Sequence, residues 1–208
     1  MVLQILAAAG LLDGSSRQRA VSYLWQARQG RPLWPAYWLE GETYSTLSCT
    51  AALLACGQSL EADDMGELIA ELLLRQSADG SWGRETRGIS AAFETAFAIK
   101  LLLKLGAGRQ CWRSVAAGMR WLLLHQLGDG SWCSEPMLRI PHKADEEPWK
   151  SENWKPDVPV GTGVLLRDHH RFLTTASVLS ALTSFLETAG NRRLVSSARP
   201  RDESAVAA

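Results

Sequence analysis

The stretch LLLRQSADGSW (Leu72–Trp82) recurs fifty positions later as LLLHQLGDGSW (Leu122–Trp132). The glutamine, aspartate, glycine, serine and tryptophan stand in the same register in both copies. A weaker copy, AVSYLWQARQGRPLW (Ala20–Trp34), keeps the glutamine and the tryptophan but lacks the Asp-Gly-Ser turn. Self-similarity at a fixed period indicates a repeat architecture, in which each unit buries its apolar face against its neighbours.

Each repeat consists of an apolar helix that ends in glutamine, a turn, and a second apolar helix. The second helices are apolar almost all round, which predicts burial on both sides, whereas the first helices carry a polar face and form an outer layer. We align the second helices on three Thr-Ala pairs, Thr50-Ala51, Thr95-Ala96 and Thr175-Ala176. The pattern predicts an all-α fold, an α/α toroid of three repeats plus a half repeat at Val2–Leu12 that forms a partial or small α/α barrel.

The repeated glutamine and tryptophan have a structural interpretation. A helix N-terminus leaves backbone N–H groups unpaired, and a glutamine amide can meet them while an indole ring covers the turn and excludes water. We therefore expect Gln76 with Trp82, and Gln126 with Trp132, to hold consecutive repeats together without taking part in chemistry.

Composition limits the classes of function and partner. The formal charge of the 208-residue chain is zero, so its net charge offers no attraction to nucleic acid or to anionic membranes. The four cysteines form no CxxC pair, which favours reduced thiols in a cytoplasmic protein. The apolar run at the N-terminus is too short to span a bilayer, and we expect a buried helix that ends near Asp13-Gly14 and no transmembrane segment. We expect one domain over residues 1–190 and a disordered tail over residues 191–208.

The aliphatic triplet, glutamine, short polar gap and Gly-x-Trp resemble the QW repeat of squalene–hopene and oxidosqualene cyclases, within the wider prenyltransferase/squalene-oxidase repeat superfamily. The resemblance covers Ala20 to Leu186. It implies an α/α toroid with an apolar cavity for an isoprenoid or another hydrophobic small-molecule substrate. The motif is specific for the fold and not for one activity.

Two catalytic patterns of the superfamily are altered in this chain. In class II terpene cyclases the third residue of a DxDD motif before Thr-Ala donates the proton, and the corresponding stretch here is AAFETA, in which Phe93 takes that place and Glu94 follows it. The zinc ligands of protein prenyltransferases would fall at Glu94, Ala96 and Thr174, which cannot form a zinc site. We therefore expect neither a metal nor a cofactor.

A long insert interrupts the third repeat at residues 134–167. Its five prolines prevent a continuous helix, and Trp149 and Trp154 give it apolar surface to pack. Long loops in compact domains are usually functional or disordered, and the two tryptophans favour an ordered lid that contributes to substrate binding.

Glu94 is the sharpest catalytic candidate, because a carboxyl on an otherwise apolar helix is expected to have a raised pKa and to act as an acid. Asp168, His169 and His170 stand where the third inner helix begins, and we expect them to converge with Glu94 on the mouth of the barrel as a proton-transfer group. The alternatives are that Asp168 caps its helix, that the histidines are solvated, and that Glu94 pairs with Arg87 or Lys100.

The repeat alignment also suggests a substrate-binding surface. Cys49 matches Glu94 in repeat position, although a small buried apolar residue is an alternative reading of it. Aromatic rings would stabilise developing positive charge. The substrate-binding candidates beside Trp149 and Trp154 are Tyr44, Cys49, Phe93, Phe97 and Phe172.

The leading hypothesis is a terpene cyclase-like enzyme that starts cyclisation or isomerisation with an acid. The alternatives are a non-catalytic α/α scaffold for a hydrophobic ligand or a partner protein, and recruitment of the same cavity to a non-terpene reaction. Three repeats supply fewer helix pairs than a six-pair barrel needs, so an apolar edge would be exposed. A homodimer that completes the helical arc is one way to cover that edge.

Overall fold

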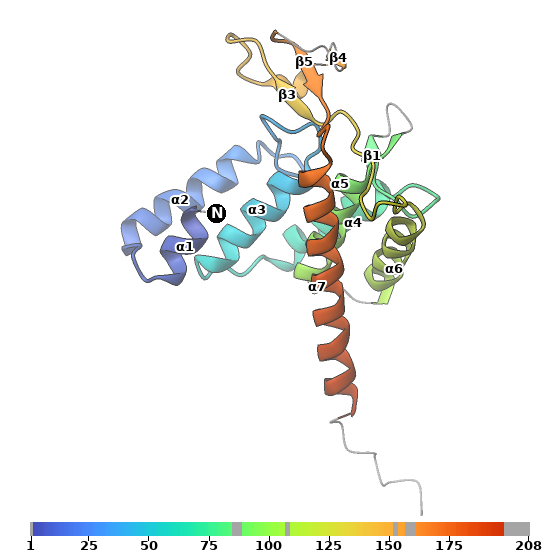
Figure 1. The fold of residues 1–208 in the computed structure, drawn as a ribbon. Helices are drawn as coiled ribbons and strands as arrows, with labels where there is room; N and C mark the ends of the chain where they lie inside the picture. The colour runs from blue at the N-terminus through green and yellow to red at the C-terminus, as the bar shows by residue number, and fades with distance from the viewer. Residues whose placement is uncertain (1, 85–88, 107–108, 152–153, 157–160, 198–208) are drawn as a thin grey trace, which may run out of the picture.

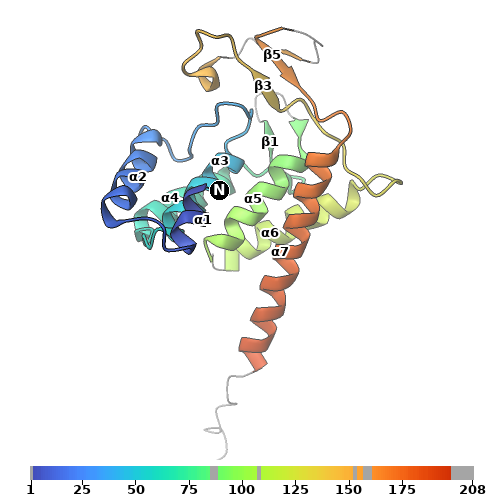
Figure 2. The same ribbon diagram turned by 60° about the vertical axis from the view of Figure 1, so that its left-hand side comes forward.

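The computed structural model describes residues 2–84, 89–106, 109–151, 154–156 and 161–197. Within this part of the chain, Figures 1 and 2 show a layer of inner helices covered by outer helices. The inner helices α3, α5 and α7 lie side by side, and α2, α4 and α6 pack behind them. The predicted all-α toroid of inner and outer helices is confirmed. The helices are α1 (Val2–Ala8), α2 (Gly14–Ala27), α3 (Thr43–Ala55), α4 (Ala62–Leu74), α5 (Ala92–Lys104), α6 (Arg109–Leu124) and α7 (Phe172–Ser197).

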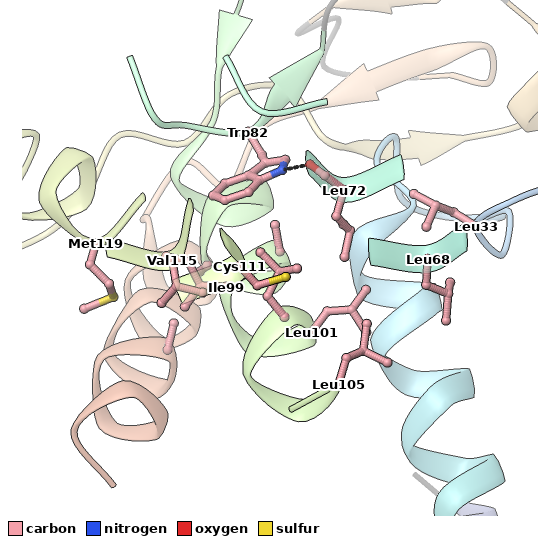
Figure 3. Packing of buried hydrophobic residues seen from close by; sticks show 14 of the residues in the cluster. Leu33, Leu68, Leu72, Trp82, Ile99, Leu101, Leu105, Cys111, Val115 and Met119 are labelled. Atoms are coloured by element: carbon pink, nitrogen blue, oxygen red, sulfur yellow. Dashed lines mark hydrogen bonds between the residues drawn. The ribbon is translucent and has the colours of Figure 1, made fainter. Parts of the chain in front are cut away.

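A tryptophan clamp closes each of the three repeats. In every repeat the indole N–H donates a hydrogen bond of 2.7 Å to a backbone carbonyl ten residues earlier, in the last turns of the outer helix. Figure 3 shows this bond for the second repeat. All three rings are almost completely buried, so each carbonyl obtains a donor where water has no access. The three pairs are Trp34 with Leu24, Trp82 with Leu72, and Trp132 with Leu122.

The repeated glutamines do hold the turns, but with the opposite polarity from the prediction. The Gln76 side-chain amide donates to the carbonyls of Gly80 (2.8 Å) and Ser114 (2.9 Å), so it joins its own turn to α6 of the next repeat. The Gln126 amide donates to the Gly130 carbonyl at 2.9 Å. The bonds described for these amides therefore differ from the expected acceptance of N–H groups at a helix N-terminus, because their partners are carbonyls.

The first inner helix aligns with the others one helical turn away from its predicted position. The backbone N–H of Trp82 donates to Thr95 Oγ1 at 2.9 Å, and that of Trp34 donates to Thr46 Oγ1 at 3.0 Å. Thr46, Thr95 and Thr175 are each the fourth residue of their helix. The alignment through Thr50 was wrong because Thr46 and Thr50 lie on one helical face, so a four-residue shift preserves the apolar pattern.

Both ends of the chain depart from their predicted boundaries. Helix α1 ends at Ala8, ahead of Gly10 with its positive φ of 68°, and Ile5 is 61% exposed, so α1 is not a buried helix. Helix α7 continues past residue 190 to Ser197, in a segment without proline before Pro200. Residues 198–208 of the predicted tail lie outside the described residues.

The insert contains short strands, which helical periodicity does not predict. Strand β5 (Val164–Leu166) lies between β3 (Leu138–Ile140), its antiparallel neighbour, and β4 (Lys155–Pro156), its parallel neighbour. A 3-10 turn, η2, covers Pro148–Lys150. A separate two-stranded ribbon joins β1 (Gly83–Arg84) and β2 (Ile89–Ser90) ahead of α5. Figures 1 and 2 show the insert at the end of the molecule where α3, α5 and α7 begin.

The main hydrophobic core is built around α5, which packs against α3, α6 and α7. Ile99, Leu101 and Leu102 on α5 are almost completely buried, and Trp82 closes the core where the turn enters (Figure 3). Gly118 of α6 makes room for the Trp82 ring, since a Cβ there would lie 2.7 Å from the indole. The clamp and the core are thus one packed unit.

One described stretch, Phe172–Gly190 of α7, has the length and mean hydropathy of a membrane-crossing helix, with 22% of it buried in the protein. Such a stretch is weak evidence by itself, because core helices of soluble proteins have the same properties. In this structure α7 packs along α5 and contributes Val178 and Ala181 to the main core.

We expect Trp82→Phe to lower the free energy of unfolding by about 1–3 kcal/mol, because a phenyl ring leaves the buried Leu72 carbonyl without its donor. Urea unfolding followed by far-ultraviolet circular dichroism measures this. The matched control is Trp38→Phe, whose ring is 57% exposed and should change stability by less than about 0.5 kcal/mol. Equal effects of the two substitutions would contradict the clamp.

Candidate active site

A cavity of about 690 Å³ lies between the helical body and the insert. The loop before α3, the end of α4 and the start of α5 form one side, and Met137, Trp149 and neighbouring insert residues form the other. Its wall combines apolar side chains with several acidic and basic ones. The apolar side chains are Leu74, Trp82, Ala91, Phe93, Pro136, Met137, Trp149 and Pro156, and the charged ones are Arg31, Glu40, Glu42, Glu71, Arg75, Glu94, Glu135, Arg139, Lys150 and Arg167.

Glu94 lies in the first turn of α5 and forms part of the cavity wall. The Thr43 hydroxyl donates to its Oε2 at 2.5 Å, whereas Oε1 is buried and has no hydrogen-bond partner among the described residues. The carboxyl packs directly against Gly41, where a Cβ would overlap it. The Glu94 carboxyl can therefore occupy this place only because residue 41 is a glycine.

The electrostatic surroundings of Glu94 favour its protonated form. Burial raises its pKa, and the negative charge of Glu42 adds to that rise, while the hydrogen bond from Thr43 and the positive charge of Arg75 act against it. The net direction is upward from the ordinary value of 4.5. Glu94 thus keeps its proton at a pH where an exposed glutamate has lost it, as expected for a general acid.

The neighbouring carboxyl, Glu42, is in the opposite situation. Arg31 forms an ion pair with its Oε1, and Arg75 forms a second one with its Oε2 at 2.9 Å. Arg75 also pairs with Glu71 at 2.6 Å. Because Arg31 and Arg75 are both directed to Glu42, the site holds one ion-paired carboxylate next to Glu94, which forms no ion pair with a described basic side chain.

Of the two alternative cationic partners, Lys100 forms no ion pair with Glu94. Lys100 Nζ donates to Ser180 Oγ at 2.9 Å and lies 5.4 Å from the centre of the Phe97 ring. Arg87 lies outside the described residues.

Three of the predicted aromatic residues form a cluster next to Glu94. The Phe93 and Phe97 ring centres are 4.7 Å apart, and Tyr44 lies 5.1 Å from Phe97 and 6.4 Å from Phe93. Phe93 faces the main cavity, and Met137 of the insert packs against the phenylalanines. Tyr44 and Phe97 line a second hollow of about 480 Å³ between α3, α5 and α7. The cluster therefore separates two hollows.

The insert is fastened over the cavity by Arg139. This buried side chain donates to the carbonyls of Ala36, Leu39 and Glu40 at 2.6–2.9 Å, and its guanidinium lies 5.7 Å from the Trp154 ring. Trp154 is therefore a buried packing residue of the insert. Trp149, by contrast, lines the cavity, and its indole N–H is buried without a partner in the described part of the chain.

The structure does not bring the predicted Asp168, His169 and His170 group to Glu94. Asp168 Oδ2 accepts the backbone N–H of Thr174 at 3.0 Å, which is the capping alternative, and the Asp168 N–H donates to Ser134. His169 and His170 are exposed, and His170 stacks on Phe172. The insert ends in β5 before this segment, so α7 begins outside the described wall of the cavity.

Cys49 and Phe172 also lie away from the cavity. Cys49 packs against the main core, and Ser45, one turn earlier, is the residue equivalent to Glu94 once the helices are aligned on Thr46. Burial raises the pKa of the Cys49 thiol to about 11, as expected for a packed and unreactive cysteine. Phe172 is exposed on α7.

Sequence reasoning missed the residues that surround the carboxyl: Gly41, Glu42, Thr43 and Arg75. Their signal is weak, because a Gly-Glu-Thr run before a helix also fits an ordinary helix start. Among the described residues no group of three or more histidine, cysteine, aspartate or glutamate side chains has the arrangement of a metal site.

Comparisons with known proteins agree with this architecture. The type II terpene cyclase MstE from Scytonema, solved with its product merosterolic acid A, is 28% identical with a TM-score of 0.76, over 89% of this chain and 53% of that chain. The same enzyme with its substrate geranylgeranyl dihydroxybenzoate is 27% identical with a TM-score of 0.75, over 89% and 54%. A protein from Actinoplanes is 28% identical with a TM-score of 0.71, over 88% and 55%. The chain thus spans about half the length of these structures.

No curated protein matches the chain significantly. The family profile described as squalene-hopene cyclase C-terminal domain matches residues 1–139, which include the three tryptophan clamps and the wall of the cavity around Glu94. The resemblance inferred from the Gln and Trp repeats is therefore confirmed, and the chain belongs to the squalene–hopene cyclase C-terminal domain family.

Proposed function

We propose that this chain is a terpene cyclase-like enzyme that binds an isoprenoid or another hydrophobic substrate in the 690 Å³ cavity and protonates it with Glu94. The observation that carries the proposal is a carboxyl on the cavity wall with a raised pKa, while the adjacent arginines are directed to Glu42. We further expect a cytoplasmic protein, in line with its free cysteines.

The cavity wall suits a substrate with an apolar chain and a polar end. Phe93, Met137 and Leu74 offer apolar surface, and the Trp149 N–H, which has no partner among the described residues, offers a donor for an oxygen atom. MstE has been solved with a molecule of this kind, geranylgeranyl dihydroxybenzoate. We propose a prenylated, oxygen-bearing substrate class for this chain.

The proposed reaction begins with transfer of the Glu94 proton to one carbon of an alkene, whose π electrons form the new C–H bond. The neighbouring carbon becomes cationic, and a second alkene attacks it to close a ring. The negative face of Phe93, which lines this cavity, stabilises the cation, and Phe97 and Tyr44 pack behind the Phe93 ring. Loss of a proton from the final cation to the Glu94 carboxylate, directly or through solvent, restores the acid and leaves a product isomeric with the substrate.

The proposed acid stands one residue after the DxDD position, which Phe93 occupies. On a helix this step rotates the side chain by about 100°, which fits the contact of Glu94 with Thr43 and Gly41 on the α3 side. The acid would therefore approach a substrate from a different wall than in the DxDD enzymes.

A non-catalytic scaffold is the second candidate, and the buried position of Glu94 Oε1 favours it. An acid whose free oxygen is packed against Gly41 must become accessible when substrate binds, which a ligand-binding scaffold does not require. The two candidates differ in turnover and share ligand binding.

We expect Glu94→Gln to reduce turnover of geranylgeranyl dihydroxybenzoate at least about 100-fold, because a positioned general acid contributes about 10²–10⁴-fold. Mass spectrometry of products isomeric with the substrate measures turnover, and tryptophan fluorescence measures binding. The exposed Glu61→Gln is the control with unchanged rate. Full activity of Glu94→Gln would exclude this acid, and binding without turnover by the unsubstituted chain would assign the cavity to a scaffold.

The raised pKa of Glu94 also predicts how stability depends on pH. Ionising this carboxyl costs more in the folded than in the unfolded protein, so its favourable contribution is complete below pH 4.5 and is lost as pH rises through the folded pKa. We expect Glu94→Gln to remove this part of the pH dependence. Urea unfolding of both proteins between pH 4 and pH 8 measures the difference, and parallel curves would contradict a raised pKa.

We expect Gly41→Ala to destabilise the fold by about 1–3 kcal/mol, since the new Cβ overlaps the Glu94 carboxyl. The control Gly66→Ala lies inside α4, where a Cβ meets no atom within 4 Å, and should stabilise by about 0.5–1 kcal/mol. Urea unfolding measures both variants. Adding Glu94→Asp, with its shorter side chain, should recover part of the loss. Equal stability of Gly41→Ala and the unsubstituted chain would contradict the packing.

A further inference from the structure

Helix α7 carries an exposed apolar face at the edge of the inner layer. It packs on α5 along one side, and in Figures 1 and 2 its C-terminal half extends beyond the other helices. On the side away from α5, Phe172 is 77%, Leu179 50% and Leu186 68% exposed. The corresponding inner helix α5 has no large apolar side chain exposed, so α7 differs from it.

The exposed face follows the spacing of a helix that packs against another helix. Its members alternate steps of four and three residues and are all solvent-exposed: Phe172, Ala176, Leu179, Thr183, Leu186 and Gly190, here called the α7 seam. A four-three repeat keeps one stripe facing a partner helix through several turns. The seam extends over about 27 Å at 1.5 Å per residue, which suits a straight helix lying alongside it.

The seam is also symmetric in position and complementary in size about residue 181. Phe172 and Gly190 are equally far from that point, as are Ala176 and Leu186, and Leu179 and Thr183. Each pair combines a larger residue with a smaller one. Two such helices in antiparallel contact would place every large side chain opposite a small one, the condition for dense packing without overlap.

We propose that α7 pairs antiparallel with α7 of a second copy of the chain, about a two-fold axis near residue 181. Phe172 then faces Gly190 of the partner subunit, and Leu186 faces Ala176 of the partner subunit. A two-fold contact of this type buries the same surface of both copies and closes on itself. The partner is thus defined by the seam, independently of any chemistry at Glu94.

Charge does not oppose the pairing. The only ionisable side chain next to the seam within residues 172–190 is Glu187, and the same symmetry places it opposite a threonine of the partner subunit. The chain as a whole has a formal charge of zero, so two copies do not repel each other at neutral pH.

The mass in solution tests the pairing. We expect sedimentation equilibrium to give twice the 22.8 kDa chain mass, and the double variant Leu179→Lys with Leu186→Lys to give the mass of one chain. The control places the same change on α6, Leu123→Lys with Leu124→Lys, where both side chains are exposed, and should remain dimeric. Circular dichroism shows whether both variants are folded.

Cysteine cross-linking tests the orientation in a Cys133→Ser background, since Cys133 is an exposed thiol. Phe172→Cys combined with Gly190→Cys should form an intermolecular disulfide under mild oxidation. Either substitution alone should not, because like positions lie about 27 Å apart in an antiparallel pair. Cross-linking by the single variants would overturn the antiparallel arrangement.

Two results would overturn the proposal as a whole. The first is a single-chain mass for the unsubstituted protein at all concentrations without binding to phosphatidylcholine vesicles, which would leave the seam without a partner copy. The second is a single-chain mass with vesicle binding that the Leu179→Lys and Leu186→Lys changes abolish, which would assign the seam to a lipid surface.

Discussion

The structure depends on a hydrogen bond that recurs in each repeat, from an indole N–H to a carbonyl ten residues earlier. The acceptor carbonyl in each outer helix lies under a buried indole ring, which shields it from water and supplies its donor. In the first two repeats the same tryptophan donates its backbone N–H to a threonine at the start of the inner helix. One residue thereby sets both the end of an outer helix and the start of an inner one. The cavity lies at those inner-helix starts, so the clamps also position the candidate acid.

Much of this fold was predictable because the residues of the clamp form a recognisable pattern in the sequence. Glutamine and tryptophan at fixed spacing predict the repeats, and polar faces separate outer from inner helices. The register of α3 was not predictable, since Thr46 and Thr50 occupy the same face and only the hydrogen bond from Trp34 distinguishes them. The strands of the insert were also not predictable. Segments of two or three residues among prolines carry no periodicity, and their order depends on pairing with β5 and on Arg139.

In the candidate site, the sequence predicts a residue only where the pattern of a single helix makes that residue stand out. Glu94 stands out as an acid on the apolar helix α5, and its raised pKa follows from burial that the helix pattern indicates. Gly41 and Thr43 reach Glu94 from the loop and helix start of the preceding repeat, and Arg75 comes from the end of α4, so tertiary packing alone reveals them. The repeat alignment places Asp168, His169 and His170 at the start of the third inner helix, and this position suggested that they form a proton-transfer group with Glu94. The alignment of α7 does not carry these side chains to the cavity, because Asp168 accepts the Thr174 N–H at the helix start and none of the three lines the described wall.

The acidity of Glu94 is inseparable from the ionisation of Glu42. Glu42 and Glu94 both lie on this wall, and the guanidinium groups of Arg31 and Arg75 both pair with Glu42. If Arg75 turned from Glu42 to Glu94, the positive charge that now weakly opposes the raised pKa would act at contact distance and favour ionisation. Glu42 therefore acts as a competitor that keeps Arg75 away from the acid, while its own negative charge discourages a second ionisation nearby. The same arrangement lets one carboxyl stabilise the fold as an ion-pair partner, while the pKa of the other stays above its ordinary value.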